Sequence, residues 1–136
     1  MKFARIVFWI AALHGFLSVP PLYFLFDYVG RHDPPPITHP HFYYGFAGVA
    51  LAFQLVFLVI ATDPVRFRPV IVPAVLEKLS YAAAVGVLYL QDRLNAAQAV
   101  TAVPDSILCV LFVIAFLRTR PPAAASRVSI PNVRIP

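Results

Sequence analysis

Ionisable side chains lie inside long apolar stretches of this sequence, where such groups are uncommon. His14, Glu77, Lys78 and Asp105 each fall within one of these stretches, and Gln54 is a fifth polar residue in the same setting. A charged group at bilayer depth costs at least about 2.5–3.5 kcal/mol, so it usually faces a helix-bundle interior and has a partner. Histidine and carboxyl groups can transfer protons, and they can also bind a polar or cationic ligand. These residues are therefore the candidates for chemistry.

Helical spacing places one polar stripe on each of four predicted helices. With a rise of about 1.5 Å per residue, the polar groups lie at similar depths, roughly 12–18 Å from one end of their helices. We therefore expect the stripes to face a shared interior. The predicted buried cluster, a candidate ligand or proton site, comprises His14, Gln54, Glu77, Lys78, Tyr81 and Asp105.

The adjacent residues Glu77 and Lys78 should address different neighbours, because successive residues of a helix point about 100° apart. Asp105 lies only about 5 Å higher than Lys78 by helical rise, which predicts a Lys78–Asp105 pair. Glu77 is expected to turn the other way, toward His14 or Gln54. Two simpler interpretations stay open: Lys78 extends toward the headgroups, and His14 has only a structural hydrogen bond.

The elements that position these residues are transmembrane helices. The chain has 136 residues, of which 60% are apolar and 12% charged, and its mean hydropathy is +0.78, outside the globular range. Residues 6–26, 42–61, 69–90 and 96–117 each approach the roughly 20 apolar residues needed to cross a bilayer. We predict an all-α, antiparallel four-helix transmembrane bundle over residues 1–120, followed by a flexible cytoplasmic tail over residues 121–136.

Prolines predict irregularities in this bundle. Pro20 and Pro21 should kink or break the first helix because neither can donate a backbone hydrogen bond, and Pro104 falls inside the fourth. Residues 28–41 are proline-rich and cannot be helical throughout, so they form a loop outside the bilayer. Small residues on the first three helices predict close packing, as expected where lipid supplies no hydrophobic drive between helices.

The basic residues indicate orientation rather than nucleic-acid binding. The net charge is +5, but Lys and Arg lie at the ends of the apolar stretches. One side of the predicted bundle holds two, Arg31 and Arg93, while the other holds eight: Lys2, Arg5, Arg66, Arg68, Arg118, Arg120, Arg127 and Arg134. This asymmetry predicts that both termini are cytoplasmic and that the protein spans the cytoplasmic (inner) membrane. A cleaved signal peptide is not expected, because no small-x-small site follows the first apolar run.

Metal and cofactor signals are weak. His32, His39 and His41, with Asp33, have a composition that could bind zinc or copper, but Pro40 equally suits the first turn of a helix. A single cysteine, Cys109, allows neither an intrachain disulfide nor a Cys-based metal site. No nucleotide-binding glycine loop, nucleophile elbow or haem-attachment motif is present, so the sequence indicates no particular cofactor.

The segment from Pro104 to Arg118, with Asp105 near its start, and the run Val75-Leu76-Glu77-Lys78-Leu79-Ser80 resemble uncharacterised bacterial four-helix membrane proteins. These are broadly similar to the DoxX-like group. The resemblance implies the four-helix layout and no established activity. Small multidrug resistance transporters have a similar length, but their first helix carries an essential Glu, whereas this chain has His14 there.

Three functions are weighed. The first is a non-catalytic membrane protein, either a lipophilic-ligand binder or an accessory subunit of a membrane complex. The second is a proton- or cation-coupled transporter using Glu77 and Asp105, and the third is an intramembrane acid–base enzyme acting on a lipid-like substrate. The candidate partners are the lipid bilayer, a lipophilic ligand, another membrane protein and a second copy of the chain; nucleic acid is not expected.

Overall fold

The computed structural model describes residues 2–33 and 36–120, and within this part of the chain the secondary structure is helical, without strands. Four helical spans are long and apolar enough to cross a membrane: Lys2–Tyr23, Pro40–Thr62, Arg68–Leu90 and Ala96–Arg118. The all-helical prediction is confirmed, and the chain is that of a small membrane protein. The predicted flexible tail, residues 121–136, lies outside the described residues.

The first span breaks at its proline pair, as predicted. Helix α1 covers Lys2–Ser18 and is followed by the 3-10 turn η1, Pro20–Tyr23. Neither Pro20 nor Pro21 can donate a backbone hydrogen bond, so the α-helical pattern cannot continue through them. The hydrogen bond from Leu22 N to Val19 O, 3.0 Å, instead spans three residues and tightens the chain.

The proline-rich connection between the first two spans is partly helical. A short helix, α2 (Phe26–His32), lies within it, and α3 (Pro40–Thr62) begins at Pro40 with His39 as its N-cap residue. Proline suits the first turn because the missing N–H would have no partner inside the helix. Helix α4 (Arg68–Leu90) begins in the same way, with Pro69 in its first turn.

The fourth span is divided into shorter helical elements, rather than forming the single helix with Pro104 inside it that the sequence predicts. It consists of α5 (Ala96–Ala99), the 3-10 turn η2 (Val100–Ala102) and α6 (Val103–Arg118). Pro104 lies in the first turn of α6 rather than in the middle of a helix, because it cannot donate a hydrogen bond to the carbonyl of Val100. Asn95 caps the start of the span in a reciprocal pair of hydrogen bonds with Gln98, each 2.9 Å long.

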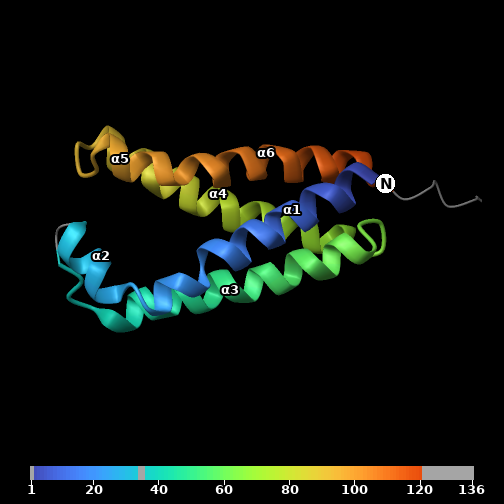
Figure 1. Ribbon diagram of the computed structural model, residues 1–136. Coiled ribbons are helices and arrows are strands. Elements are labelled where there is room, and N and C mark those ends of the chain that lie inside the picture. Colours follow the sequence, from blue (N-terminus) through green and yellow to red (C-terminus); the bar gives the residue numbers. More distant parts are fainter. Residues whose placement is uncertain (1, 34–35, 121–136) are drawn as a thin grey trace, which may run out of the picture.

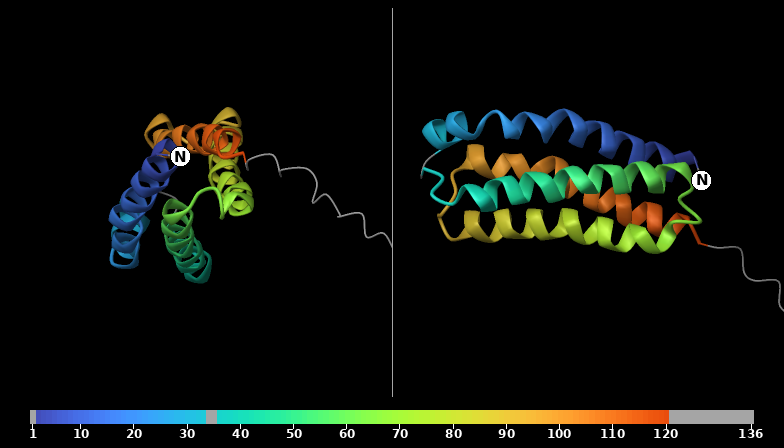
Figure 2. Two further views of the ribbon diagram at one scale, coloured as in Figure 1. Left: turned by 90° about the vertical axis from the view of Figure 1, so that its right-hand side faces the viewer. Right: turned by 90° about the horizontal axis from the view of Figure 1, so that it is seen from below.

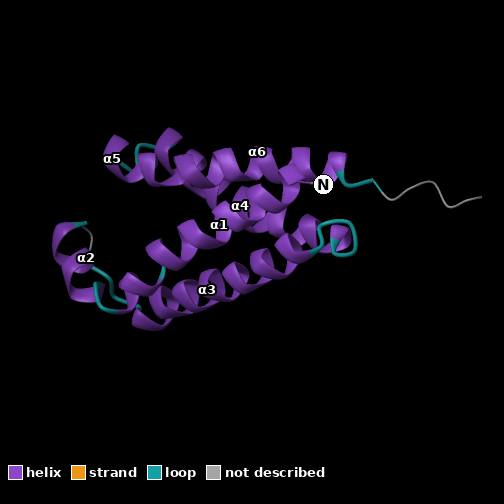
Figure 3. Ribbon diagram, turned by 45° about the vertical axis from the view of Figure 1, so that its right-hand side comes forward, coloured by secondary structure: helices purple, strands orange, loops and turns teal. Residues whose placement is uncertain are grey.

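The spans form two arms. Helix α1 packs along α3 in the first arm, and α4 packs along α6 in the second. Figure 1 shows the arms close together at the end that holds the N-terminus, the α3–α4 connection and the end of α6, and apart at the end that holds α2 and α5. The end-on view in Figure 2 and the secondary-structure view in Figure 3 show the same separation.

A packed aromatic core joins the arms at their close end. Phe8 of α1 stacks on Phe112 of α6 with 4.3 Å between ring centroids, and Phe57 of α3 meets Phe112 edge-on at 5.1 Å. All three rings are fully buried. Small residues such as Ala11 and Ala74 let the backbones approach around them. This cluster holds the two arms together.

The outer surfaces of the spans are apolar. Only 22–33% of the residues in the most apolar stretch of each span are buried inside the protein. Large side chains such as Leu13, Leu17, Leu55 and Leu76 are more than half exposed. A surface this apolar would be unfavourable in water and is suited to lipid.

Candidate functional site

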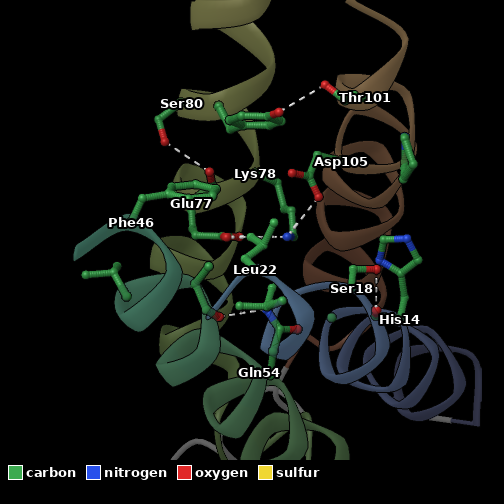
Figure 4. A pocket seen from close by; sticks show the side chains of 16 residues that line it. His14, Ser18, Leu22, Phe46, Gln54, Glu77, Lys78, Ser80, Thr101 and Asp105 are labelled. Atoms are coloured by element: carbon green, nitrogen blue, oxygen red, sulfur yellow. Dashed lines mark hydrogen bonds and ion pairs between the residues drawn. The ribbon is translucent and has the colours of Figure 1, made fainter. Parts of the chain in front are cut away.

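A partly open cavity of about 630 Å³ lies between the two arms, in the half of the bundle nearer α2 and α5. All four spans contribute to its lining, and most of its wall is apolar. Figure 4 shows it from close by. Besides polar groups, the lining includes Gly15, Leu22, Phe46, Val49, Ala50 and Pro104.

The six residues of the predicted polar cluster all line this cavity. They are not equally buried. Gln54 and Lys78 are buried, Glu77, Tyr81 and Asp105 are half-buried, and His14 is exposed. The helical stripes therefore located the shared interior, whereas the expectation that all six are buried is wrong for His14. The arms separate at the depth of His14, which leaves its side chain uncovered.

Lys78 lies at the centre of an ion-pair network. Its Nζ is 2.8 Å from Asp105 Oδ1 and 3.2 Å from Glu77 Oε2, and it donates a 3.3 Å hydrogen bond to Glu77 Oε1. Figure 4 shows this nitrogen between the two carboxylates. The predicted Lys78–Asp105 pair is present. The ammonium is held inside the bundle, 5.3 Å above the ring of Phe57, rather than extended toward the headgroups.

The expected direction of Glu77 is wrong. Its carboxylate meets the neighbouring Lys78, rather than His14 or Gln54. The backbone directions of the two residues do differ by about 100°, but the four-carbon stem of lysine lets its nitrogen reach back toward Glu77. Both carboxylates then share one ammonium, and Asp105 additionally lies in the first turn of α6, where the helix dipole favours a negative charge.

The opposite wall contains Gln54, which is 1% exposed. Its Nε2 donates to the backbone oxygen of Ala50 at 2.7 Å, while its Oε1 has no hydrogen-bond partner among the described residues. The carboxamide packs where a side chain at position 15 would stand, so glycine at that position is required. This contact fixes Gln54 against α1 and leaves one buried acceptor without a donor.

Tyr81 and His14 are the remaining members of the predicted cluster. The Tyr81 hydroxyl is 3.1 Å from Thr101 Oγ1, and its ring stacks with Phe46. The backbone oxygen of His14 accepts a 2.8 Å hydrogen bond from Ser18, but no hydrogen bond or ion pair to its imidazole is present within the described residues. His14 is therefore free to meet a ligand, and no carboxylate orients it.

Polar contacts of the cavity stay within one arm. The ion-pair network and the Tyr81–Thr101 contact belong to the second arm. The Gln54 contact and a 2.9 Å hydrogen bond from the Tyr43 hydroxyl to the backbone oxygen of Leu22 belong to the first. Among the described residues, no hydrogen bond or ion pair between cavity-lining side chains crosses from one arm to the other. The space between the arms is free of internal polar bridges.

The sequence did not identify the apolar wall. Leu22, Phe46, Val49 and Pro104 line the cavity although none belongs to the predicted cluster. A signal was present for Phe46, which precedes Ala50 and Gln54 by four and eight residues and so shares their helix face. Leu22 follows Ser18 and His14 by the same four and eight residues, but it lies in η1, beyond the proline break, where α-helical spacing no longer predicts which face a residue shares.

The histidines between the first two spans are separate from the cavity. The imidazole of His32 bonds to the backbone oxygen of Tyr28 at 2.9 Å, and that of His39 contacts Thr38 Oγ1 at the same distance. The rings of His39 and His41 lie edge to face, 5.9 Å apart. Within residues 2–33 and 36–120, no group of three or more His, Cys, Asp or Glu side chains could hold a metal ion.

Comparison with known proteins finds no matching family model, no matching curated protein and no matching solved structure. The resemblance to DoxX-like proteins stays a prediction from sequence. The cavity, its ion-pair network and its apolar wall are therefore the basis for a function.

Proposed function

We propose that this protein is a non-catalytic binder of a lipophilic ligand, held within the cytoplasmic membrane in the cavity between the two arms. The supporting observation is the cavity itself, about 630 Å³ in volume, with apolar walls from all four spans and an ion-pair network in one wall. Binding sites for drug-sized ligands are commonly 300–1,000 Å³, mostly apolar, with a few placed polar groups. This cavity has that size and composition.

A ligand-binding role is favoured over transport by the packing at the close end of the bundle. Phe8, Phe57 and Phe112 are fully buried beside the cavity and fill the space between the arms. A proton- or cation-coupled transporter using Glu77 and Asp105 needs access to these groups from both sides. The aromatic core blocks access from the close end, so Glu77 and Asp105 can be reached from the open half of the bundle and not from the other side.

An intramembrane enzyme receives less support from the geometry. General acid–base catalysis requires a group positioned within hydrogen-bond reach of the proton it transfers. His14 has no orienting partner within the described residues, and both carboxylates are engaged by Lys78. An accessory subunit would contact its partner through the apolar exterior of the bundle. Such a role gives no reason for the polar residues inside, whereas a ligand in the cavity does.

We place the spans in alternating directions across the membrane, with both termini in the cytoplasm, from the asymmetry of Lys and Arg. The cavity then lies in the half of the bundle away from the cytoplasm. A cysteine introduced at Ser126, in a variant whose Cys109 is replaced by alanine, should resist an impermeant thiol reagent on intact cells and react after lysis. Labelling on intact cells would overturn this orientation.

The binding proposal is tested by mass spectrometry of lipophilic molecules that co-purify with the full chain. Wild-type protein should carry a molecule that Val49→Trp, which fills the cavity, excludes. Val59→Trp is the matched control, because Val59 is on the same helix but does not line the cavity. Equal recovery of every co-purifying lipid from the two variants would refute a role for this cavity.

A further inference from the structure

The cavity wall has an excess of negative charge. Lys78 contributes one positive charge, while Glu77 and Asp105 contribute two negative charges, so the ionised network has a formal charge of −1. No other ion pair to these three residues is present among the described residues, and His14 pairs with neither carboxylate. A net charge in a low-dielectric site is unfavourable unless a positive charge balances it. A proton or a cationic ligand can supply that charge.

Hydrogen-bond acceptors also exceed donors around the cavity. The ammonium of Lys78 has three N–H groups, and its two carboxylate partners occupy two of them. Gln54 Oε1 is buried and has no hydrogen-bond partner in the described chain, and Glu77 Oε2, although 3.2 Å from Lys78 Nζ in the ion pair, accepts no hydrogen bond there. Buried polar atoms of this kind are normally paired. A group that brings N–H donors into the cavity would correct this imbalance.

The two acceptors belong to opposite walls. Gln54 is on the first arm and Glu77 is on the second, and both line the space between them. Gln54 uses one of its two amide N–H groups on the backbone of its own helix, and no hydrogen bond from the other to Glu77 is present among the described residues. An occupant between the arms can supply further donors, and small shifts of these side chains would bring the acceptors to it.

The rest of the wall requires an apolar body. Leu22, Phe46, Val49 and Pro104 surround the polar groups, and the cavity volume corresponds to about 20 water molecules at roughly 30 Å³ each. A small inorganic cation would leave this apolar space unfilled. A ligand with a hydrocarbon portion would fill it and bury its apolar surface.

From these observations we infer that the ligand is a lipophilic amine, whose protonated amino group lies beside Glu77 and Asp105 and whose hydrocarbon portion lies against the apolar wall. This inference rests on the proposed ligand-binding function and adds the chemical class of the ligand. The ammonium balances the charge of the network and donates hydrogen bonds to acceptors that now lack them. An acid of the same length would add a second uncompensated negative charge.

The test compares three probes with the same hydrocarbon chain on purified full-length protein in a neutral detergent at pH 7: decylamine, 1-decanol and decanoate. Native mass spectrometry measures bound stoichiometry and apparent affinity, and thermal unfolding provides a second readout. Decylamine should bind once per chain and more tightly than decanol, and decanoate should bind least. Val49→Trp should weaken binding of decylamine and decanol alike, because it removes space rather than charge.

Charge-removing variants make the test specific. Asp105→Asn should weaken decylamine binding by roughly tenfold to a hundredfold, the range for a hydrogen bond to a charged group, and change decanol binding little. Glu77→Gln removes the same charge from the neighbouring carboxylate and should have the same effect, which protects the test if one variant folds poorly. Asp27→Asn is the matched control, because Asp27 lies in α2, outside the cavity lining.

The outcomes separate the two proposals. Decanol bound as tightly as decylamine, with neither charge variant discriminating between them, would overturn the amine inference and leave the binding function standing. Failure of all three probes to bind, together with unchanged co-purifying lipids in Val49→Trp, would overturn both. Selective loss of decylamine in both charge variants supports the inference.

Discussion

Lys78→Met should destabilise the protein more than removal of either carboxylate, because Lys78 is the shared partner of both. At an effective dielectric constant of 20, the gross attraction of its ammonium is about 6 kcal/mol to Asp105 at 2.8 Å and about 5 kcal/mol to Glu77 at 3.2 Å. Desolvation of the three groups cancels much of this sum. Leaving a buried charge unpaired typically costs about 3–5 kcal/mol, which is the expected effect of Lys78→Met.

Asp105→Asn should cost less, because Lys78 and Glu77 remain as a neutral pair. In the Lys78→Met background, Asp105→Leu should recover part of the loss by removing one of two facing carboxylates. Addition of Glu77→Gln should recover most of the remainder, since an uncharged network of similar volume can be nearly as stable as the ion pairs. From most to least stable, the expected order is thus wild type, Asp105→Asn, the double variant Lys78→Met/Asp105→Leu, and Lys78→Met alone. The triple variant, which also carries Glu77→Gln, should be close to wild type.

The measurement is reversible thermal unfolding in one neutral detergent at one pH, followed by circular dichroism. Leu76→Ala is a control, because Leu76 is on the same helix, 58% exposed and outside the cavity. Strictly additive effects of Lys78→Met and Asp105→Leu would refute the shared-partner geometry. So would a Lys78→Met variant as stable as Asp105→Asn, which would indicate that the lysine nitrogen reaches the headgroups instead.

Three further substitutions have expected outcomes from the packing. Gly15→Ala should lower stability by about 1–3 kcal/mol, because the new methyl group overlaps the Gln54 carboxamide. Adding Gln54→Ala should relieve that overlap, as thermal unfolding of the single and double variants would show. Phe112→Ala should lower the free energy of unfolding by about 3–5 kcal/mol, because it empties the centre of the aromatic core. An equally large loss of stability from Val113→Ala, at a neighbour that is 41% exposed, would contradict this explanation. Asn95→Ala should cost about 1 kcal/mol through loss of the capping box, and hydrogen exchange should show faster opening of the α5 amides; unchanged exchange would argue against that role.

The helical spans could be predicted because their signal is local. An apolar stretch of about 20 residues must form its backbone hydrogen bonds internally in lipid, so its length nearly determines its structure. The effect of Pro20 was equally local, since it follows from a missing donor. Pro104 carried the same signal, but the choice between a kinked helix and the turn η2 depends on how the neighbouring residues pack.

The sequence could predict which polar residues line the cavity, but it could not predict all of the contacts between them. Helical rise alone placed Lys78 within reach of Asp105, because both positions are set by the backbone. The contact between Lys78 and Glu77 depends on lysine rotamers, which the sequence does not determine. The cavity was hidden for a different reason: it depends on the separation of the arms, which arises from packing among residues distant in sequence such as Phe8 and Phe112.

The separation of the arms follows from where the polar contacts lie. Lipid provides no hydrophobic force to draw the arms together, so only packing and polar bonds between them can close the space. Packing does so at Phe57 and Phe112, but Gln54 and the network around Lys78 are each bonded within their own arm. A hydrogen bond from Gln98 of α5 to the Asp33 carboxylate, just beyond α2, joins the two arms outside the cavity lining. The arms are thus packed together at the close end and linked by this hydrogen bond at the other, with the proposed ligand site between them.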